Sequence, residues 1–353
     1  MTELMSQHWG ATLSGEHIDL FTLRNANGIE AVITNYGGRI VRLNTPDRNG
    51  RFDDIVLGFD TLDGYLEKNP YFGALIGRYA NRIANGEFQL DGTPHHLERN
   101  SHGNSLHGGL RGFDKVVWRP RPVETKTGQA LELSYVSPDG EEGYPGTLTA
   151  TVVYSLNDAN ELRIDYIATT DKKTILNLTN HSYFDLSGQG RGNILDHVVT
   201  INADKFTPVN ENLIPTGELR SVDRTPFDFR QPTRIGDRID NKDQQLQYAQ
   251  GYDHNYVLNR TGREPSLAAR VRDPHTGRVM EVLTTQPGVQ FYTGNHLDGT
   301  MKGKGGIIYG FRTAVCFETQ HFPDSPHHPE FPSTVLSPGE RFEALTVFRF
   351  SAQ

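Results

Sequence analysis

Leu148–Leu156 reads Leu-Thr-Ala-Thr-Val-Val-Tyr-Ser-Leu, and residues 162–169 read Leu-Arg-Ile-Asp-Tyr-Ile-Ala-Thr. In both stretches an apolar side chain occupies every second position, and Thr, Ser, Arg or Asp fill most of the positions between. Strict alternation is typical of a β-strand that buries one face in a core. Asn157 and Asp158, between the two stretches, form a turn signal. These residues therefore predict two strands, each with one face in the core.

Strand patterns recur along the rest of the chain, separated by turn signals that are rich in Gly, Pro, Asn and Asp. Further strands are expected at residues 31–34, 40–44, 131–136, 198–203, 279–284, 289–292, 313–318 and 345–350. No long stretch has apolar residues at helical spacing, so only short helices are expected, near residues 62–67 and 244–248. Many short strands with Gly and Pro between them indicate an all-β sandwich or barrel. We expect one domain over residues 1–353, built as two large packed sheets.

Composition excludes several classes of protein. The 353 residues carry a net charge of −8 with both signs mixed, and no basic stripe points to nucleic acid. Cys316 is the single cysteine, so no internal disulfide forms, which suits a reducing compartment. The first residues lack a basic and then apolar secretion signal, and no stretch has the length of a membrane span. We therefore expect a soluble cytoplasmic protein.

Polar residues gather in six segments that we expect to be loops on the sheet scaffold, where sites are often built. They are residues 77–82, 100–112, 177–185, 251–255, 286–295 and 318–325. The third follows the apolar run 174–176 and contains His181, which can exchange a proton near neutral pH. The alternative for His181 is a structural role at the end of a strand.

Glu318 ends an apolar run, so its carboxylate is expected to be partly desolvated, which raises its pKa and its strength as a base. The alternative is a Glu that faces solvent. Arg78 and Asn81 suit the binding of hydroxyls or an anion, and equally suit a solvated loop. The remaining candidates each have a structural alternative as a turn or edge-strand residue: His107, Asp253 and Gln290.

Metal and cofactor motifs are missing from the sequence. Fourteen His occur, but there is no HExxH, no CxxC and no second cysteine, so we expect no metal site. No P-loop occurs, and the Gly-rich residues 302–306 lack the GxGxxG spacing, so we expect no nucleotide cofactor. Cys316 lies in an apolar strand, where packing is favoured over reactivity.

Six motifs in order make the chain resemble the aldose 1-epimerase (galactose mutarotase) family over nearly its whole length. They are Gly-Arg-Tyr-Ala-Asn-Arg-Ile at 77–83, Leu-His-Gly-Gly at 106–109, Thr-Asn-His-Ser-Tyr-Phe at 179–184, Gly-Tyr-Asp-His at 251–254, Pro-Gly-Val-Gln-Phe-Tyr-Thr-Gly-Asn at 287–295 and Glu-Thr-Gln at 318–320. Each motif alone is weak, whereas six in order are a specific signal.

The resemblance implies a large antiparallel β-sandwich of the galactose mutarotase-like type, with the site in a cleft on one sheet. It implies that Glu318 is the general base and His181 the general acid of an isomerase acting on free hexoses such as D-glucose and D-galactose. It further implies sugar-binding roles for Arg78, Asn81, His107, Asp253 and Gln290. Ring opening and closure by acid–base chemistry needs no cofactor, and a shared acid and base predict a bell-shaped pH profile.

Three other readings stay open at this point. An epimerase of hexose 6-phosphates would need a cationic pocket, which Arg78 and Arg82 would offer. A non-catalytic sugar-binding module would keep the amides and aromatics but would need neither Glu318 nor His181. A carbohydrate lyase or hydrolase would need a further acid or Tyr that the sequence does not single out. The preferred sugar and the choice between monomer and homodimer are left open.

Overall fold

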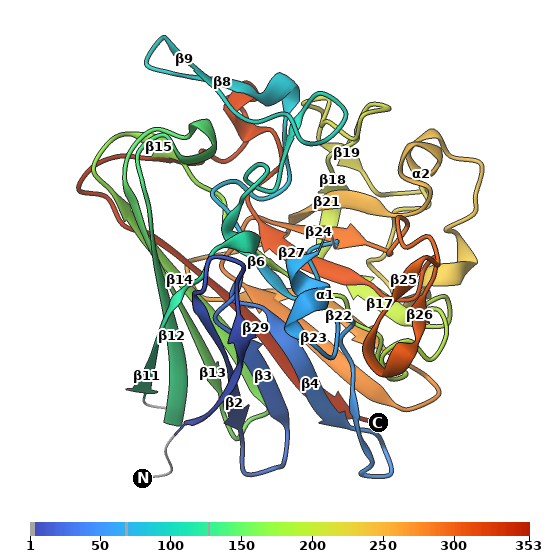
Figure 1. Ribbon diagram of the computed structural model, residues 1–353. Helices are drawn as coiled ribbons and strands as arrows, with labels where there is room; N and C mark the ends of the chain where they lie inside the picture. The colour runs from blue at the N-terminus through green and yellow to red at the C-terminus, as the bar shows by residue number, and fades with distance from the viewer. Residues whose placement is uncertain (1–3, 68–69, 126–127) are drawn as a thin grey trace.

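The computed structural model describes residues 4–67, 70–125 and 128–353, and most of its regular structure is β-strand (Figure 1). Its largest element is a nine-stranded antiparallel sheet. In order across the sheet, the strands are β11 (Arg119–Thr125), β12 (Gly128–Ser137), β13 (Leu148–Leu156), β14 (Glu161–Thr170), β29 (Phe342–Ala352), β23 (Arg278–Thr284), β22 (Ser266–Arg272), β17 (Val198–Ile201) and β20 (Thr233–Arg234).

The hairpin of β13 and β14 confirms the alternation that predicted it. Leu148 pairs with Thr170 at one end and Leu156 with Leu162 at the other, so the apolar positions of both strands share one face. Asn157 closes the turn, because its side-chain oxygen accepts the N–H groups of Ala159 and Glu161.

Two five-stranded sheets face the nine-stranded sheet. The first contains β1 (Met5–Ala11), β2 (His17–Arg24), β3 (Glu30–Thr34), β4 (Ile40–Pro46) and β5 (Phe52–Asp54). The second, which we call the site sheet, has the order β19 (Arg220–Ser221), β18 (Ala203–Phe206), β21 (Asp253–Leu258), β24 (Gly288–Tyr292) and β27 (Cys316–Gln320). One hydrophobic core joins all three sheets, as Leu133, Ile33 and Phe317 illustrate.

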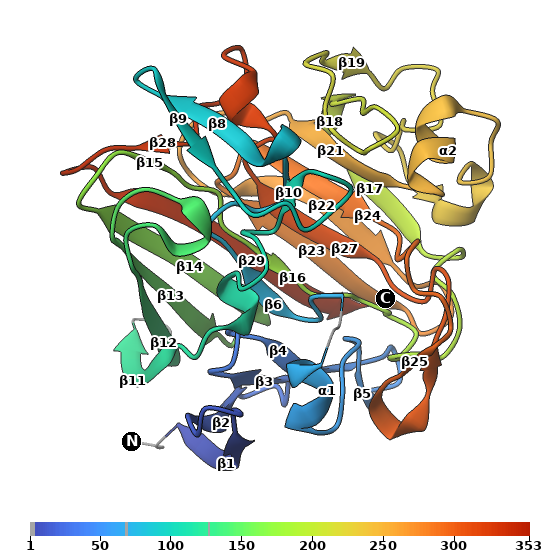
Figure 2. The same cartoon turned by 45° about the horizontal axis from the view of Figure 1, so that its top comes forward.

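A short pair, β6 (Ala74–Ile76) and β16 (Thr179–His181), links the two five-stranded sheets (Figure 2). The N–H of Ile40 on β4 donates to the carbonyl oxygen of Gly73, and the N–H of Val315 donates to that of Phe184. The layer that faces the nine-stranded sheet is therefore nearly continuous, which agrees with the predicted pair of large packed layers.

The remaining elements are short. They are α1 (Leu62–Leu66), α2 (Gln244–Ala249), the strands β7 (Arg82–Ile83), β8 (Glu87–Leu90), β9 (Thr93–His96), β10 (Ser105–Leu106), β15 (Thr174–Ile175), β25 (Met301–Lys302), β26 (Ile308–Tyr309) and β28 (Val335–Leu336), and the 3₁₀ helices η1 (Ala84–Gly86), η2 (Phe113–Lys115), η3 (Glu141–Gly143), η4 (Ile235–Asp237), η5 (Lys304–Gly306) and η6 (Ser325–His327). Both α-helices confirm the predicted ones. None of the helices in the described part of the chain has the length and apolar character that crossing a bilayer requires.

Several predicted strands have different bounds in the structure, and two of these differences change the sheet to which residues belong or the place of a site residue in its strand. The stretch 198–203 is divided between β17 and β18, which belong to different sheets. The strand expected at 313–318 is β27, which begins only at Cys316 and continues to Gln320. Glu318 therefore lies in the middle of a strand and not at its end. The sequence shows no alternation that would mark the bounds of this strand, because both of its faces are buried.

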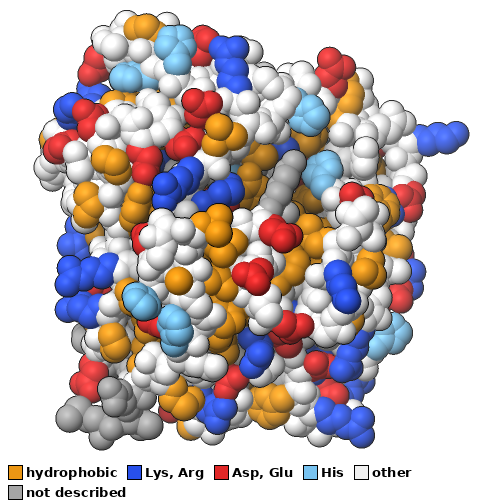
Figure 3. Space-filling view, viewed as in Figure 1, with side chains coloured by type: hydrophobic (Ala, Val, Ile, Leu, Met, Phe, Trp, Pro, Cys, Tyr) orange, Lys and Arg blue, Asp and Glu red, His pale blue; other side chains and the backbone are white. Residues whose placement is uncertain are grey.

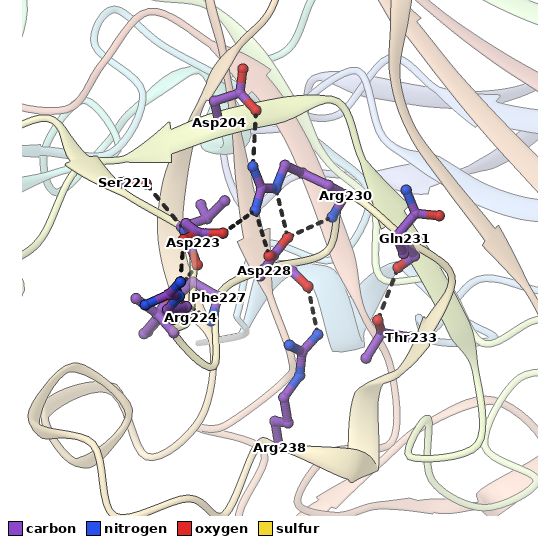
Figure 4. Close-up of polar contacts among 12 residues, drawn as sticks. Asp204, Ser221, Asp223, Arg224, Phe227, Asp228, Arg230, Gln231, Thr233 and Arg238 are labelled. Atoms are coloured by element: carbon purple, nitrogen blue, oxygen red, sulfur yellow. Dashed lines mark hydrogen bonds and ion pairs between the residues drawn. The ribbon is translucent and has the colours of Figure 1, made fainter.

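An ion-pair network holds the loop after β19 against the edge of the site sheet (Figure 4). The guanidinium of Arg230 lies 2.8 Å from a carboxylate oxygen of Asp223, 2.7 Å from one of Asp228 and 3.5 Å from one of Asp204 on β18. These groups are partly exposed, so we assign the network to loop positioning and not to a large share of the stability.

Candidate active site

The polar face of the site sheet collects side chains from three neighbouring strands. The register places Asp253 of β21 beside Tyr292 of β24, and Gln290 of β24 beside Glu318 of β27. Side chains alternate between the faces of a sheet. Phe291 and Phe317, which pair across β24 and β27, therefore enter the core, while the polar groups share the opposite face. Both faces are buried, so the polar groups are held in a largely water-free environment.

His181 reaches this face because the segment that carries it is tied to both ends of β27. Before β16, the side chain of Asn177 accepts the N–H of His321 and donates to its carbonyl oxygen, at 2.9 and 3.1 Å. After β16, Phe184 and Val315 exchange two backbone hydrogen bonds. The result is a distance of 3.6 Å between Nε2 of His181 and Oε1 of Glu318.

Burial sets the protonation of this pair. Glu318 is 2 % exposed, and desolvation, with the charge of Asp253 adding to it, raises its pKa well above the ordinary value, although Arg82 opposes the shift. His181 is 4 % exposed, and desolvation lowers its pKa to about 4, with Asp253 opposing. Both shifts favour the neutral form of the pair, in which the proton resides on the carboxyl group and the imidazole is uncharged.

Asp253 and Gln290 form a hydrogen-bonded pair beside Glu318. The Nε2 atom of Gln290 donates to Oδ1 of Asp253 at 2.6 Å, which leaves Oδ2 of Asp253 facing Nη1 of Arg82 at 3.9 Å. Arg82 is buried and also donates through Nη1 to the side-chain oxygen of Asn81 at 3.4 Å. A carboxylate, an amide and a guanidinium that are fixed in this way offer both acceptors and donors to a polyhydroxy ligand.

The orientation of His107 is fixed by the backbone of Asn81. The backbone N–H of His107 donates to the carbonyl oxygen of Asn81, and the backbone N–H of Asn81 donates to Nδ1 of the His107 imidazole at 3.1 Å. Because Nδ1 is an acceptor, the proton of the neutral imidazole is on Nε2, and burial keeps the pKa of this His well below 6.5. His107 therefore offers a donor N–H beside His181 and Glu318.

The structure also brings together a possible metal-binding trio. His107, His181 and Glu318 place one donor atom each within 4.8 Å of one another. A metal bound at Nε2 of His107 would require that nitrogen to be unprotonated, which conflicts with the hydrogen bond that Nδ1 accepts from Asn81. The geometry favours proton transfer and hydrogen bonding over coordination.

Six of the seven predicted site residues converge, whereas the guanidinium of Arg78 does not join them. It donates to the side chain and carbonyl oxygen of Ser137 and to the carbonyl oxygens of Pro138 and Pro145, at 2.7 to 3.0 Å. Arg82, which sequence reasoning did not place in the site, lies beside Asp253 instead. Its position directly after Asn81 was the available signal.

A family model described as aldose 1-epimerase matches residues 19–349. The chain belongs to the aldose 1-epimerase family. It is 53% identical over 319 residues to the galactose mutarotase of Bos taurus, with 90% of each chain covered, and 51% identical to that of Homo sapiens over the same length and coverage. It is 37% identical over 341 residues to the aldose 1-epimerase of Escherichia coli, covering 96% of this chain and 97% of the relative.

Solved structures agree with this membership. The galactose 1-epimerase of Lactobacillus acidophilus superposes with a TM-score of 0.86 at 28% identity, covering 99% of both chains. An aldose epimerase homologue from C. elegans also gives a TM-score of 0.86, at 29% identity, covering 94% of this chain and 98% of the other. The sheet-rich fold that the sequence predicted is therefore confirmed as the galactose mutarotase fold.

Proposed function

We propose that this member of the family is an aldose 1-epimerase that interconverts the α and β anomers of free hexoses, including D-glucose and D-galactose. The observation that supports it most is the buried Glu318–His181 pair, whose Oε1 and Nε2 atoms lie 3.6 Å apart on a polar sheet face. An acid and a base at this separation can reach two neighbouring oxygens of one small sugar. The names of the relatives, galactose mutarotase and aldose 1-epimerase, support the same activity.

Ring opening moves one proton through the pair. Glu318 takes the proton of the O1 hydroxyl while His181 donates a proton to the ring oxygen, and the C1–O5 bond breaks to give the open-chain aldehyde. After rotation about C1–C2, the O5 hydroxyl attacks the other face of C1, His181 takes back its proton, and Glu318 returns the other one to O1. The pair thus begins as carboxylate and imidazolium, becomes carboxylic acid and imidazole, and returns to its first state.

Burial favours the neutral form of the pair, which is the form present with the open-chain sugar. The shifts of both pKa values, upward for Glu318 and downward for His181, have this effect. The ionic form that opens the ring is then a minor tautomer carrying the same number of protons. A hydrogen bond from the O1 hydroxyl to the carboxylate, and one from the imidazolium to the ring oxygen, are expected to increase its population.

The surrounding side chains hold the sugar in our proposal. Asp253 accepts hydrogen bonds from hydroxyl groups, and Gln290 fixes the carboxylate by donating to it. His107 donates through Nε2, and Asn81 keeps that imidazole in place. Arg82 supplies the charged donor that the sequence interpretation had assigned to Arg78. Arg78 acts as a structural residue.

Specific observations weigh against the alternative activities. A phosphate pocket needs cationic groups that are free to bind it, but the guanidinium of Arg82 lies against Asp253 and that of Arg78 is bonded to the backbone. A binding module would not need an acid and a base side by side, whereas Glu318 and His181 lie 3.6 Å apart and have pKa values shifted in opposite directions. An uncharged sugar that is isomerised, and not only bound, fits the site best.

We further propose that the protein acts as a single domain in the cytoplasm, as a monomer or homodimer, on a small sugar and without cofactor, membrane or nucleic acid. Its single thiol, Cys316, is buried, which suits a reducing compartment. Lys and Arg side chains are interspersed with Asp and Glu on the face shown in Figure 3, which does not favour a polyanionic partner.

Polarimetry tests the activity. Freshly dissolved α-D-glucose, α-D-galactose and glucose 6-phosphate are followed with and without the protein, in a buffer that catalyses little by itself. We expect the approach to anomeric equilibrium to accelerate in proportion to protein for the two free sugars and much less for the phosphate. Acceleration of the phosphate alone would support a hexose 6-phosphate epimerase, and no acceleration of any sugar would overturn the proposal in favour of a binding module.

A further inference from the structure

Two tyrosine rings lie nearly parallel to the imidazole of His181. Tyr183 has a centroid distance of 5.0 Å and an interplanar angle of 14°, and Tyr71 has a distance of 5.8 Å and an angle of 20°. Two further rings, those of His107 and Tyr292, approach edge-on at 5.2 and 6.2 Å. His181 is therefore surrounded by aromatic groups to an extent that the motif in the sequence does not indicate.

This packing is important for the orientation of the His181 imidazole, because polar contacts do little to orient it. A catalytic histidine is commonly fixed by a hydrogen bond from its second nitrogen to a carboxylate or carbonyl group. Nδ1 of His181 has no hydrogen bond to another residue in the described part of the chain. Its other nitrogen, Nε2, faces Glu318, which is its partner in the reaction. The orientation of the imidazole must come mainly from the rings against it.

We propose that Tyr183 and Tyr71 form an aromatic clamp that orients His181 and stabilises its protonated form. The inference rests on the proposed function, because only there does His181 need to carry a positive charge. The face of an aromatic ring attracts a cation, and the attraction is stronger where water is excluded. Burial disfavours the imidazolium, so the clamp offsets part of that penalty at the atom that must donate the proton.

Both rings of the clamp are held by their own surroundings. The ring of Tyr183 is 2 % exposed and meets Phe72 edge-on at 4.9 Å and Tyr292 edge-on at 5.9 Å. Tyr71 adopts a left-handed backbone with φ of 66° two residues before Gly73, whose N–H donates to the carbonyl oxygen of His181. Each tyrosine is thus a positioning residue that acts through His181.

The test compares Tyr183→Phe with Tyr183→Leu, using steady-state polarimetry and thermal unfolding of the full chain. Tyr183→Phe keeps the ring and is expected to keep most of kcat. Tyr183→Leu is expected to lower kcat by about tenfold while KM changes less than about twofold, because the ring acts on the acid in the chemical step and not on sugar binding. Phe59→Leu is the matched control, because Phe59 packs against the same cluster and its ring meets Tyr65 and Phe72, not His181 or either ring of the clamp.

Different results separate the clamp from the proposed function. Equal kcat values for Tyr183→Leu, Tyr183→Phe and the wild type would overturn the clamp, and so would equal losses in Tyr183→Leu and Phe59→Leu. If Tyr183→Leu does not fold, the half-buried Tyr71 takes its place, with the same contrast between Tyr71→Phe and Tyr71→Leu. A wild-type protein that accelerates no free sugar would instead overturn the proposed function itself.

Discussion

The second faces of β13 and β27 differ in what covers them. On β13 the positions that alternate with the core are Thr149, which is exposed, Thr151 and Val153, which are partly exposed, and Ser155, which is buried next to the turn. On β27 the corresponding positions are Cys316, Glu318 and Gln320, and all three are buried. Both strands turn alternate side chains to opposite faces, but water solvates the second face of β13 and protein encloses that of β27.

Enclosure changes the protonation and hydrogen bonding of an ordinary polar residue. On the outer face of the nine-stranded sheet, Glu132 forms an ion pair with Arg121 at 2.7 Å that is largely exposed on the arginine side. On the site sheet, Oε2 of Glu318 has no hydrogen-bond partner in the described part of the chain, and burial raises the pKa of this carboxyl. The same residue type is thus an ordinary surface group in one sheet and a candidate base in the other.

The same Glu→Gln substitution, made once on the site sheet and once on the nine-stranded sheet, should give the largest difference in kcat. Glu318→Gln removes the base and is expected to lower kcat by about 10²–10⁴-fold while the melting temperature is kept or raised, because a buried carboxyl is replaced by a neutral amide. Glu132→Gln is the control and is expected to leave kcat unchanged, with an effect on the free energy of unfolding within about 0.5 kcal/mol. Polarimetry and thermal unfolding measure both. Similar kcat values for the two variants would remove Glu318 from the mechanism.

His181→Asn should have the second-largest effect. The substitution removes the acid from the ring oxygen, and kcat is expected to fall by about 10²–10⁴-fold, with the circular dichroism spectrum unchanged. The measurement is again polarimetry on α-D-galactose. Turnover at the wild-type rate in a correctly folded variant would refute the assigned role.

Leu133→Ala, a substitution in the nine-stranded sheet, should lower stability without lowering kcat. Leu133 of β12 is fully buried in the main core, so its truncation leaves a cavity and should lower the free energy of unfolding by about 2–5 kcal/mol. The kcat of the folded fraction should be unchanged, because Leu133 lies on β12 of the nine-stranded sheet, which carries none of the candidate site residues. Urea denaturation and polarimetry at low temperature check the two parts. A loss of kcat without a loss of stability would contradict the division between the sheets.

The two arginines of the first motif should differ in what they lose. Arg82→Lys replaces a fixed fork of donors by a point charge beside Asp253, and kcat/KM is expected to fall by up to about 10²-fold with little change in stability. Arg78→Lys gives up hydrogen bonds to Ser137, Pro138 and Pro145, and should instead cost about 1–3 kcal/mol of unfolding free energy. The opposite pattern would return Arg78 to the sugar site.

Most of the scaffold was predictable because alternation is a local signal. The hairpin of β13 and β14 and both short helices follow directly from their residues. Segments 177–185 and 251–255 were expected to be loops, but the structure places His181 in β16 and Asp253 in β21. Polar residues on an enclosed face imitate the composition of a loop, which explains these differences and why the strand was expected to end at Glu318 and not at Gln320.

The site was predictable from its motifs and less so from side-chain direction. His107, His181, Asp253, Gln290 and Glu318 meet as expected, because the register of three strands and the ties through Asn177 and Phe184 bring them together. In the segment 77–82, the sequence has no periodicity that indicates which arginine lies beside Asp253. The choice between Arg78 and Arg82 depends on long-range contacts with Ser137 and Asp253, which a single sequence does not contain.

The pH profile of kcat/KM, after subtraction of the spontaneous rate, tests most directly whether Glu318 and His181 share one proton. Below the pKa of His181, about 4, both groups are protonated and no base remains; above the raised pKa of Glu318, both have lost their protons and no acid remains. We predict a bell whose lower limb lies near pH 4 and whose upper limb lies well above the ordinary range of a carboxyl. Constant activity from roughly pH 3 to pH 10, or an upper limb that persists in Glu318→Gln, would contradict this account.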